Sequence, residues 1–119
     1  MKFKDGIPIY LQLTQEIANL ILSGEYKPGE RIQSVRELAL VFGVNPNTVQ
    51  KALVLAEEQG LVFAQGPEGR FVSEDERLIT RLRKEAISKE VKEFLERLRQ
   101  LGISRNEVID YLKEEESEV

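Results

Sequence analysis

A short polar stretch at residues 47–51 carries the side chains whose types and spacing predict a definite chemistry. Asn47 and Gln50 have amides that can bond adenine bidentately on its major-groove edge, and Thr48 can bond a base or a phosphate. Lys51 can pair with a phosphate, and the N–H groups at the start of a helix add affinity for anions. These residues predict a surface that contacts duplex DNA.

Catalytic and metal chemistry has little support in the composition. The chain has no Cys, which excludes disulfides, thiolate nucleophiles and Cys-ligated metals, and no His, which removes the commonest general base. We therefore expect no cofactor and no metal. An enzyme would have to use carboxylates such as Glu85, Glu93 and Glu96. With Lys89 and Arg97 as spaced partners, these acids resemble a solvated helix face and suggest no reaction class.

The net charge of −4 is unusual for a protein that binds nucleic acid. Residues 1–72 contain seven Lys and Arg against eight Asp and Glu, a net charge of −1. Residues 73–119 contain ten against thirteen, a net charge of −3. Any DNA-binding site must therefore be a local basic patch.

The polar stretch lies at the start of a predicted helix. Asn45 is a favoured N-cap residue, and Pro46 suits the first helical position, where its missing N–H costs nothing. The other side of this helix is aliphatic up to a stop at Gly60, with Val49, Ala52, Leu53 and Ala56 at helical spacing. We expect this side to face a core and the polar side chains to face solvent.

Two more helices are predicted before this one, and a hairpin after it. The first opens at Pro8 and runs for about sixteen residues; the second starts at the capping box Ser34-Val35-Arg36-Glu37 and ends at Gly43. Short strands are expected over residues 61–64 and 70–72, joined by a loop over 65–69. This is the order of a winged helix-turn-helix, in which the start of the third helix enters the major groove.

Motifs with characteristic spacing run almost continuously from residue 8 to residue 72. They are Pro-Ile-Tyr at 8–10, Ser-Gly at 23–24, Pro-Gly-Glu-Arg at 28–31, Ser-Val-Arg-Glu-Leu-Ala at 34–39, Val-Asn-Pro-Asn-Thr-Val-Gln-Lys-Ala-Leu at 44–53, Glu-Gln-Gly-Leu at 58–61 and Gly-Arg-Phe-Val at 69–72. The pattern resembles the GntR family of bacterial regulators. The Asn-Pro-Asn-Thr helix start and the short C-terminal part resemble its YtrA-like branch, whose members often repress transport operons.

The resemblance also implies which residues contact DNA. Arg36 would contact the DNA backbone or a base, and the hairpin would lie along the minor groove or its phosphates as a wing. The predicted DNA-binding residues are Ser34, Arg36, Asn45, Pro46, Asn47, Thr48, Gln50, Lys51, Gln65, Gly66, Gly69 and Arg70. The chain departs from the family pattern at Gln33, where Pro is usual, and in a wing loop that is one residue longer and carries Glu68 at its tip.

Several of these residues also have a purely structural interpretation. The alternatives are ion pairs for Arg36 (with Glu37 or Glu30) and Arg70 (with Glu68), capping for Asn45, turn geometry for Gly66 and Gly69, and solvation for Thr48 and Lys51. For Asn45 and the two glycines we favour the structural interpretation, and for Arg36 and Thr48 we favour DNA contact. Lys51 and Arg70 are evenly balanced.

The C-terminal part is predicted to be helical. A long helix is expected from Glu74 to Leu101, then a break at Gly102, a second capping box at 104–107, a shorter helix and a frayed acidic tail. Two helices alone cannot easily bury their apolar residues, so a second copy is expected to cover them. The predicted dimer interface consists of Leu82, Val91, Phe94, Leu95, Leu98, Leu101, Val108 and Leu112. The alternative is a monomeric helical cap.

The sequence thus predicts a mainly α fold with a small β-hairpin. A winged helix-turn-helix over residues 7–74 precedes a two-helix dimerisation segment over 75–119. We expect a homodimeric repressor that binds an inverted-repeat operator; the main alternative is a winged-helix module that docks protein. No apolar run approaches the roughly 20 residues of a membrane helix and no secretory signal opens the chain, so we expect a cytoplasmic protein without membrane contact. A large effector domain is not expected, and the sequence marks no small-molecule effector.

Overall fold

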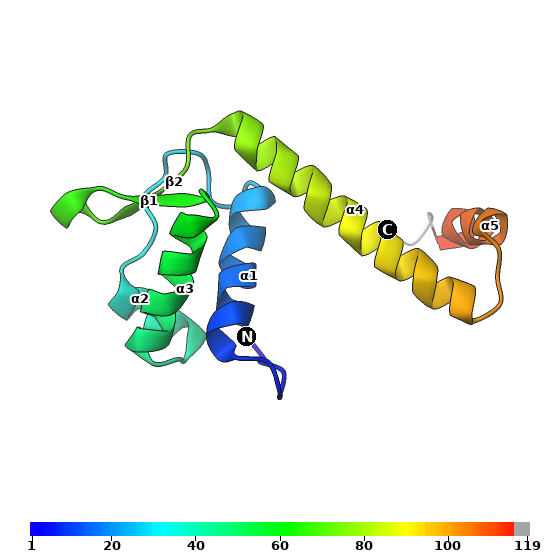
Figure 1. Ribbon diagram of the computed structural model, residues 1–119, viewed down its shortest axis with the longest axis horizontal. Coiled ribbons are helices and arrows are strands. Elements are labelled where there is room, and N and C mark those ends of the chain that lie inside the picture. The colour runs from blue at the N-terminus through cyan, green and yellow to red at the C-terminus, as the bar shows by residue number, and fades with distance from the viewer. Residues whose placement is uncertain (116–119) are drawn as a thin grey trace. The chain divides into compact units, whose positions relative to one another are not determined.

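The computed structural model describes residues 1–115, which form five α-helices and one β-hairpin (Figure 1). The elements are α1 (Ile9–Leu22), α2 (Val35–Phe42), α3 (Pro46–Glu58), β1 (Val62–Ala64), a 3-10 turn (Gly66–Glu68), β2 (Arg70–Val72), α4 (Glu76–Gln100) and α5 (Arg105–Glu115). Two compact units divide the chain, one of residues 1–83 and one that begins at Lys84. The predicted fold class, a winged helix-turn-helix followed by two helices, is confirmed.

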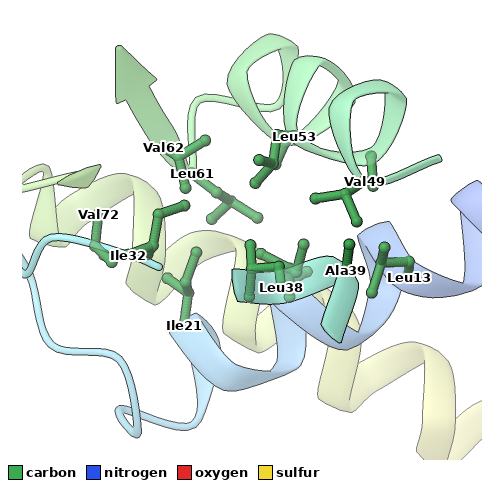
Figure 2. Close-up of a cluster of buried hydrophobic side chains, with 14 residues drawn as sticks. Leu13, Ile21, Ile32, Leu38, Ala39, Val49, Leu53, Leu61, Val62 and Val72 are labelled. Atoms are coloured by element: carbon green, nitrogen blue, oxygen red, sulfur yellow. The ribbon is translucent and has the colours of Figure 1, made fainter. Parts of the chain in front are cut away.

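Aliphatic side chains from α1, α2, α3 and the hairpin form the core of the first unit. Figure 2 shows Leu13, Leu38 and Val49 pointing into one shared interior, although they come from three different helices. Val62 and Val72 bring the hairpin into the same cluster. Because α1 packs along α3 and α2 packs on α3, the buried side of α3 is fixed and its other side is left outside.

Local signals set the boundaries of α2 and α3. The backbone N–H of Glu37 donates to Ser34 Oγ at 3.2 Å, and the N–H of Ser34 donates to Glu37 Oε1 at 3.2 Å, which confirms the predicted capping box. Gly43 ends α2 in the left-handed conformation, with φ of 66°. The turn between the two helices is therefore tight.

The hairpin has a third chain segment along one edge. β1 and β2 pair antiparallel, with Val62 opposite Val72. Arg31 forms an isolated bridge with Phe71, and the N–H of Ile32 donates to the carbonyl of Arg70 at 2.9 Å. The segment that precedes α2 is thus tied to β2, which fixes the wing relative to the helix-turn-helix.

The first unit extends into α4. Ile79 and Leu82 are half-buried and pack against its core, so the boundary between the units lies after Arg83, whereas the sequence suggested a boundary after residue 74. Leu82, which we predicted for subunit contact, therefore has packing partners within its own unit.

The second unit combines the rest of α4 with α5. The N–H of Glu107 donates to Ser104 Oγ at 3.2 Å and that of Ser104 to Glu107 Oε1 at 3.1 Å, so the second capping box is also confirmed. Val108 is buried, whereas α4 has no buried residue along its whole length. Glu114 and Glu115, predicted as part of a frayed tail, belong to α5, and the rest of that tail lies outside the described residues. Within residues 1–115 no helix is both long and apolar enough to cross a membrane.

Candidate nucleic-acid interface

The start of α3 presents polar side chains to solvent. Asn47 and Gln50 are exposed and Thr48 is half-buried. Val49, which lies between them in sequence, is fully buried, and Leu53 one turn later is buried as well. The helical period therefore separates an amide-rich outer face from an aliphatic inner face, as the sequence predicted.

Asn45 and Pro46 shape this helix start. Asn45 Oδ1 accepts a hydrogen bond from the backbone N–H of Asn47 at 2.8 Å, which is the capping role favoured from the sequence. Pro46 occupies the first helical position and is exposed. Both residues lie within the predicted interface, and the geometry gives each of them a structural reason to be there.

Lys51 lies on the side of α3 that faces α1. Its Nζ is 5.5 Å from the centroid of the Tyr10 ring, a distance typical of a cation–π contact. The sequence suggested only phosphate contact or simple solvation for this lysine. The aromatic partner comes from α1, so no local pattern around Lys51 indicates it.

Arg36 projects from the first turn of α2 and is exposed. Within residues 1–115 it forms no ion pair with Glu37 or Glu30, the two partners considered from the sequence. Glu37 is instead held by the cap, and the hydrogen bond from the Ser34 N–H is the main reason why the pKa of its carboxyl lies below the ordinary value. The Arg36 guanidinium is thus available to an external anion.

The loop of the wing is closed by two backbone hydrogen bonds. The N–H of Gln65 donates to the carbonyl of Gly69 at 2.8 Å, and the N–H of Glu68 donates to the carbonyl of Gln65 at 3.1 Å. Gly69 has φ of 108° and ψ of −155°, a conformation that is essentially restricted to glycine. Gln65 and Gly66 are exposed at the tip, where a groove of DNA could reach them.

Arg70 points away from the tip of the wing. Its guanidinium forms a hydrogen-bonded ion pair with Glu57 near the end of α3. The sequence had suggested Glu68 as the alternative ion-pair partner, and within residues 1–115 that pair does not form. The pair with Glu57 ties β2 to α3 and supports a structural role for Arg70. The sequence does not indicate this pair, because its partners lie thirteen positions apart.

Arg31 was absent from the predicted site, yet its side chain reaches the wing. Its Nε donates to the carbonyl of Glu68 at 2.9 Å. Arg31 belongs to the Pro-Gly-Glu-Arg motif at 28–31, but the motif does not indicate where its side chain points.

Gln33, which replaces the usual Pro, accepts a hydrogen bond from the Tyr26 hydroxyl at 3.3 Å. In the described part of the chain, no group of His, Cys, Asp or Glu is arranged to hold a metal ion.

Comparison with known proteins places this chain in a family. Residues 9–72 match the model for bacterial regulatory proteins of the gntR family. The chain is 33% identical to YhcF, an HTH-type transcriptional regulator of Bacillus subtilis, over 94% of this chain and 93% of YhcF. It is 30% identical to the HTH-type transcriptional repressor YtrA of Bacillus subtilis, over 98% of this chain and 90% of YtrA.

Solved structures agree with these sequence matches. A GntR family transcriptional regulator from Listeria monocytogenes superposes with a TM-score of 0.87 at 33% identity, covering 94% of this chain and 98% of the regulator. AraR(DBD), solved in complex with operator ORR3, superposes with a TM-score of 0.55 at 32% identity, and the match covers 61% of this chain and 88% of the AraR(DBD) chain. The chain is therefore a GntR-family transcription regulator of the YtrA-like kind, and not an enzyme.

Proposed function

We propose that this regulator binds a specific operator in double-stranded DNA and represses transcription, acting in the cytoplasm. The observation that carries the proposal is that Asn47 and Gln50 are exposed at the start of α3 while Val49 and Leu53 are buried. This arrangement leaves two amides open to base edges in a major groove. The operator complex of AraR(DBD) and the repressor YtrA support the same function.

The other predicted residues take different parts in this interface. Ser34 and Arg36 bind the DNA backbone beside the groove that α3 enters. Gln65 and Gly66 reach the neighbouring minor groove from the tip of the wing. Thr48, half-buried beside Asn47, contacts a base or a phosphate from the same helix start. The remaining members of the set contribute less to affinity, because they cap, shape or brace the elements: Asn45, Pro46, Lys51, Gly69 and Arg70.

We also propose that the second unit joins two copies into a homodimer. α4 buries none of its residues, and Val91 and Phe94 on it are exposed apolar side chains. An apolar hollow of about 340 Å³ lies between the end of α4 and α5, and Leu101 at its edge is 77% exposed. A second copy covering this surface would remove apolar area from water.

A dimer explains how a single short recognition helix achieves operator selectivity. Two copies related by a two-fold axis would place their α3 helices about 34 Å apart, which matches half-sites one helical turn apart in an inverted repeat. Of the predicted interface residues, Phe94, Leu98, Leu101 and Leu112 line the hollow together with the buried Val108, and Leu95 is half-buried on α4. Leu82 contributes less, because it packs on the first unit.

One observation favours a second candidate function. Leu40 is 85% exposed on α2, and Val41 beside it is also exposed, so the winged unit carries an apolar surface that DNA does not require. A module that docks protein through this surface is the alternative. It does not account for the exposed amides of α3.

A salt titration tests the proposal. Duplexes are first selected from a random pool, and the affinity of the protein for the selected duplex is then measured from low to moderate salt. DNA binding through several phosphates gives a plot of log K against log salt with a slope of about −0.9 per phosphate neutralised. Selection of a shared sequence together with a steep slope would support the proposal. No selected sequence and no slope would leave the docking alternative.

A further inference from the structure

Arg31 lies in the segment that joins the wing to the helix-turn-helix. Its backbone bridges Phe71 of β2, and the neighbouring N–H of Ile32 donates to the carbonyl of Arg70 at 2.9 Å. On the other side of Arg31 along the chain, the carbonyl of Glu30 accepts from the N–H of Val72 at 2.8 Å. These bonds fix the position from which the Arg31 side chain extends.

The side chain extends along the wing to its tip. Nε donates to the carbonyl of Glu68 at 2.9 Å. A Cβ at Gly69 would lie 3.3 Å from Arg31 Nε and 3.5 Å from Nη2, so the guanidinium lies directly against the Cα of that glycine. One N–H donor of the Arg31 guanidinium, that of Nε, thus holds the wing loop.

Arg31 also lies three residues before Ser34, the N-cap of α2. It therefore belongs to the short segment that joins the wing, which its backbone and Nε contact, to the first turn of α2, which carries Arg36. Its positive charge also makes a small contribution to the lowered pKa of the Glu37 carboxyl, after the larger effect of the hydrogen bonds from Ser34. Arg31 is exposed, and in residues 1–115 its terminal nitrogens have no ion pair or hydrogen bond.

The distribution of positive charge makes this position important. The winged part of the chain has seven basic residues in residues 1–72, and its net charge is −1. Two of the four near the predicted interface already have partners, since Lys51 lies over Tyr10 and Arg70 pairs with Glu57. The other two are Arg36 and Arg31.

We propose that Arg31 is a further DNA-binding residue, whose Nε fixes the tip of the wing while its terminal nitrogens bind a backbone phosphate between the wing and α2. The proposal rests on the DNA-binding function proposed above. The planar fork of Arg allows both roles at once, because its donors point in separate directions. A lysine at this position would keep the charge but not both contacts.

The test compares the salt dependence of operator binding for the full chain and three variants. Arg31→Gln keeps an N–H donor for the Glu68 carbonyl but removes the charge. Arg31→Lys keeps the charge. Lys27→Gln is the matched control, because it removes one positive charge from the same segment at a place away from the wing tip. Lys27 lies two residues before Gly29, whose N–H donates to the carbonyl of Val72 at the end of the hairpin opposite the loop. All are measured below the lowest melting temperature of the set.

Arg31→Gln should weaken binding about tenfold and reduce the magnitude of the salt slope by about 0.9 for each bound subunit. Arg31→Lys should keep the slope of the parent protein, and so should Lys27→Gln. A slope for Arg31→Gln equal to that of the parent would overturn the phosphate contact, even if affinity fell. If the parent protein itself bound duplex DNA without salt dependence, the proposed function would fail first, which separates the two failures.

Discussion

At the scale of single residues, the proposed function assigns the reading of the operator sequence to Asn47 and Gln50. Both are exposed amides at the start of α3, and an amide bonded bidentately to adenine discriminates against other bases. Asn47→Ala or Gln50→Ala should each reduce the preference for one operator position by about 1–3 kcal/mol. The measurement is the affinity for the operator and for duplexes with that position changed.

Arg36→Ala is the comparison for these two variants. In the proposed function the exposed Arg36 guanidinium binds a backbone phosphate, so its loss should weaken binding to all duplexes by a similar factor. If Asn47→Ala and Gln50→Ala also weakened all duplexes equally, the start of α3 would not be the base-reading element.

Glu37 gives the start of α2 a dependence on pH. The pKa of its carboxyl is lowered, chiefly by the N–H of Ser34, so the folded state binds this proton at a lower pH than the unfolded state does. The stabilisation is therefore present above the ordinary carboxyl pKa and is lost as the pH falls through the lowered value. We expect the stability difference between the parent protein and Glu37→Gln to shrink across that acidic window.

The measurement is chemical unfolding of both proteins from neutral to acidic pH. Glu58→Gln, a change at an exposed carboxyl at the end of α3, serves as a charge-matched control. A difference between the parent and Glu37→Gln that stayed constant down to about pH 3 would contradict the role of the charged cap.

At the scale of elements, the wing depends on the backbone at Gly69. Its φ of 108° with ψ of −155° suits only glycine, and a Cβ there would press on Arg31 Nε at 3.3 Å. Gly69→Ala should destabilise the wing by about 1–3 kcal/mol and weaken operator binding, since the loop must rearrange. Thermal unfolding and operator affinity measure the two effects.

Gly66→Ala is the matched control for the wing. Gly66 also has a positive φ, of 53°, but a Cβ there would meet nothing within 4 Å. Gly66→Ala should destabilise the protein only by the cost of a left-handed alanine backbone, about 1 kcal/mol, and should weaken operator binding less than Gly69→Ala does. Equal effects of the two substitutions would mean that contact with Arg31 does not hold the wing.

At the scale of the whole molecule, dimerisation would convert two weak DNA contacts into one selective contact. Leu101 is 77% exposed at the edge of the apolar hollow of the second unit. Leu101→Glu should place an unpaired charge in the proposed interface, producing monomers and a large loss of operator affinity. Sedimentation across a range of concentrations measures the oligomeric state.

Leu40→Glu is the control for the dimer. Leu40 is the more exposed of the two, at 85%, but it lies on α2 of the winged unit. This change should leave the oligomeric state unaltered. Monomers with Leu40→Glu and dimers with Leu101→Glu would place the interface on α2 instead.

The sequence alone determined those features that depend on single residues or on residues up to four positions apart. Both capping boxes, the stop at Gly43, the Asn45 cap and the two faces of α3 were predicted, because a helix brings such neighbours together whatever surrounds it. The order of these elements then predicted the winged helix-turn-helix. The exposure of the α3 amides follows from the same helical period, since Asn47 and Gln50 fall on the side of the helix opposite its aliphatic residues.

Only the tertiary structure decided which partners the basic side chains take. Lys51 meets Tyr10 of α1, Arg70 meets Glu57 of α3, and Arg31 reaches the carbonyl of Glu68, thirty-seven residues away. The packing of Ile79 and Leu82 on the core belongs here too. Contacts of this kind arise when separate elements pack together, so their spacing along the chain carries no periodic signal.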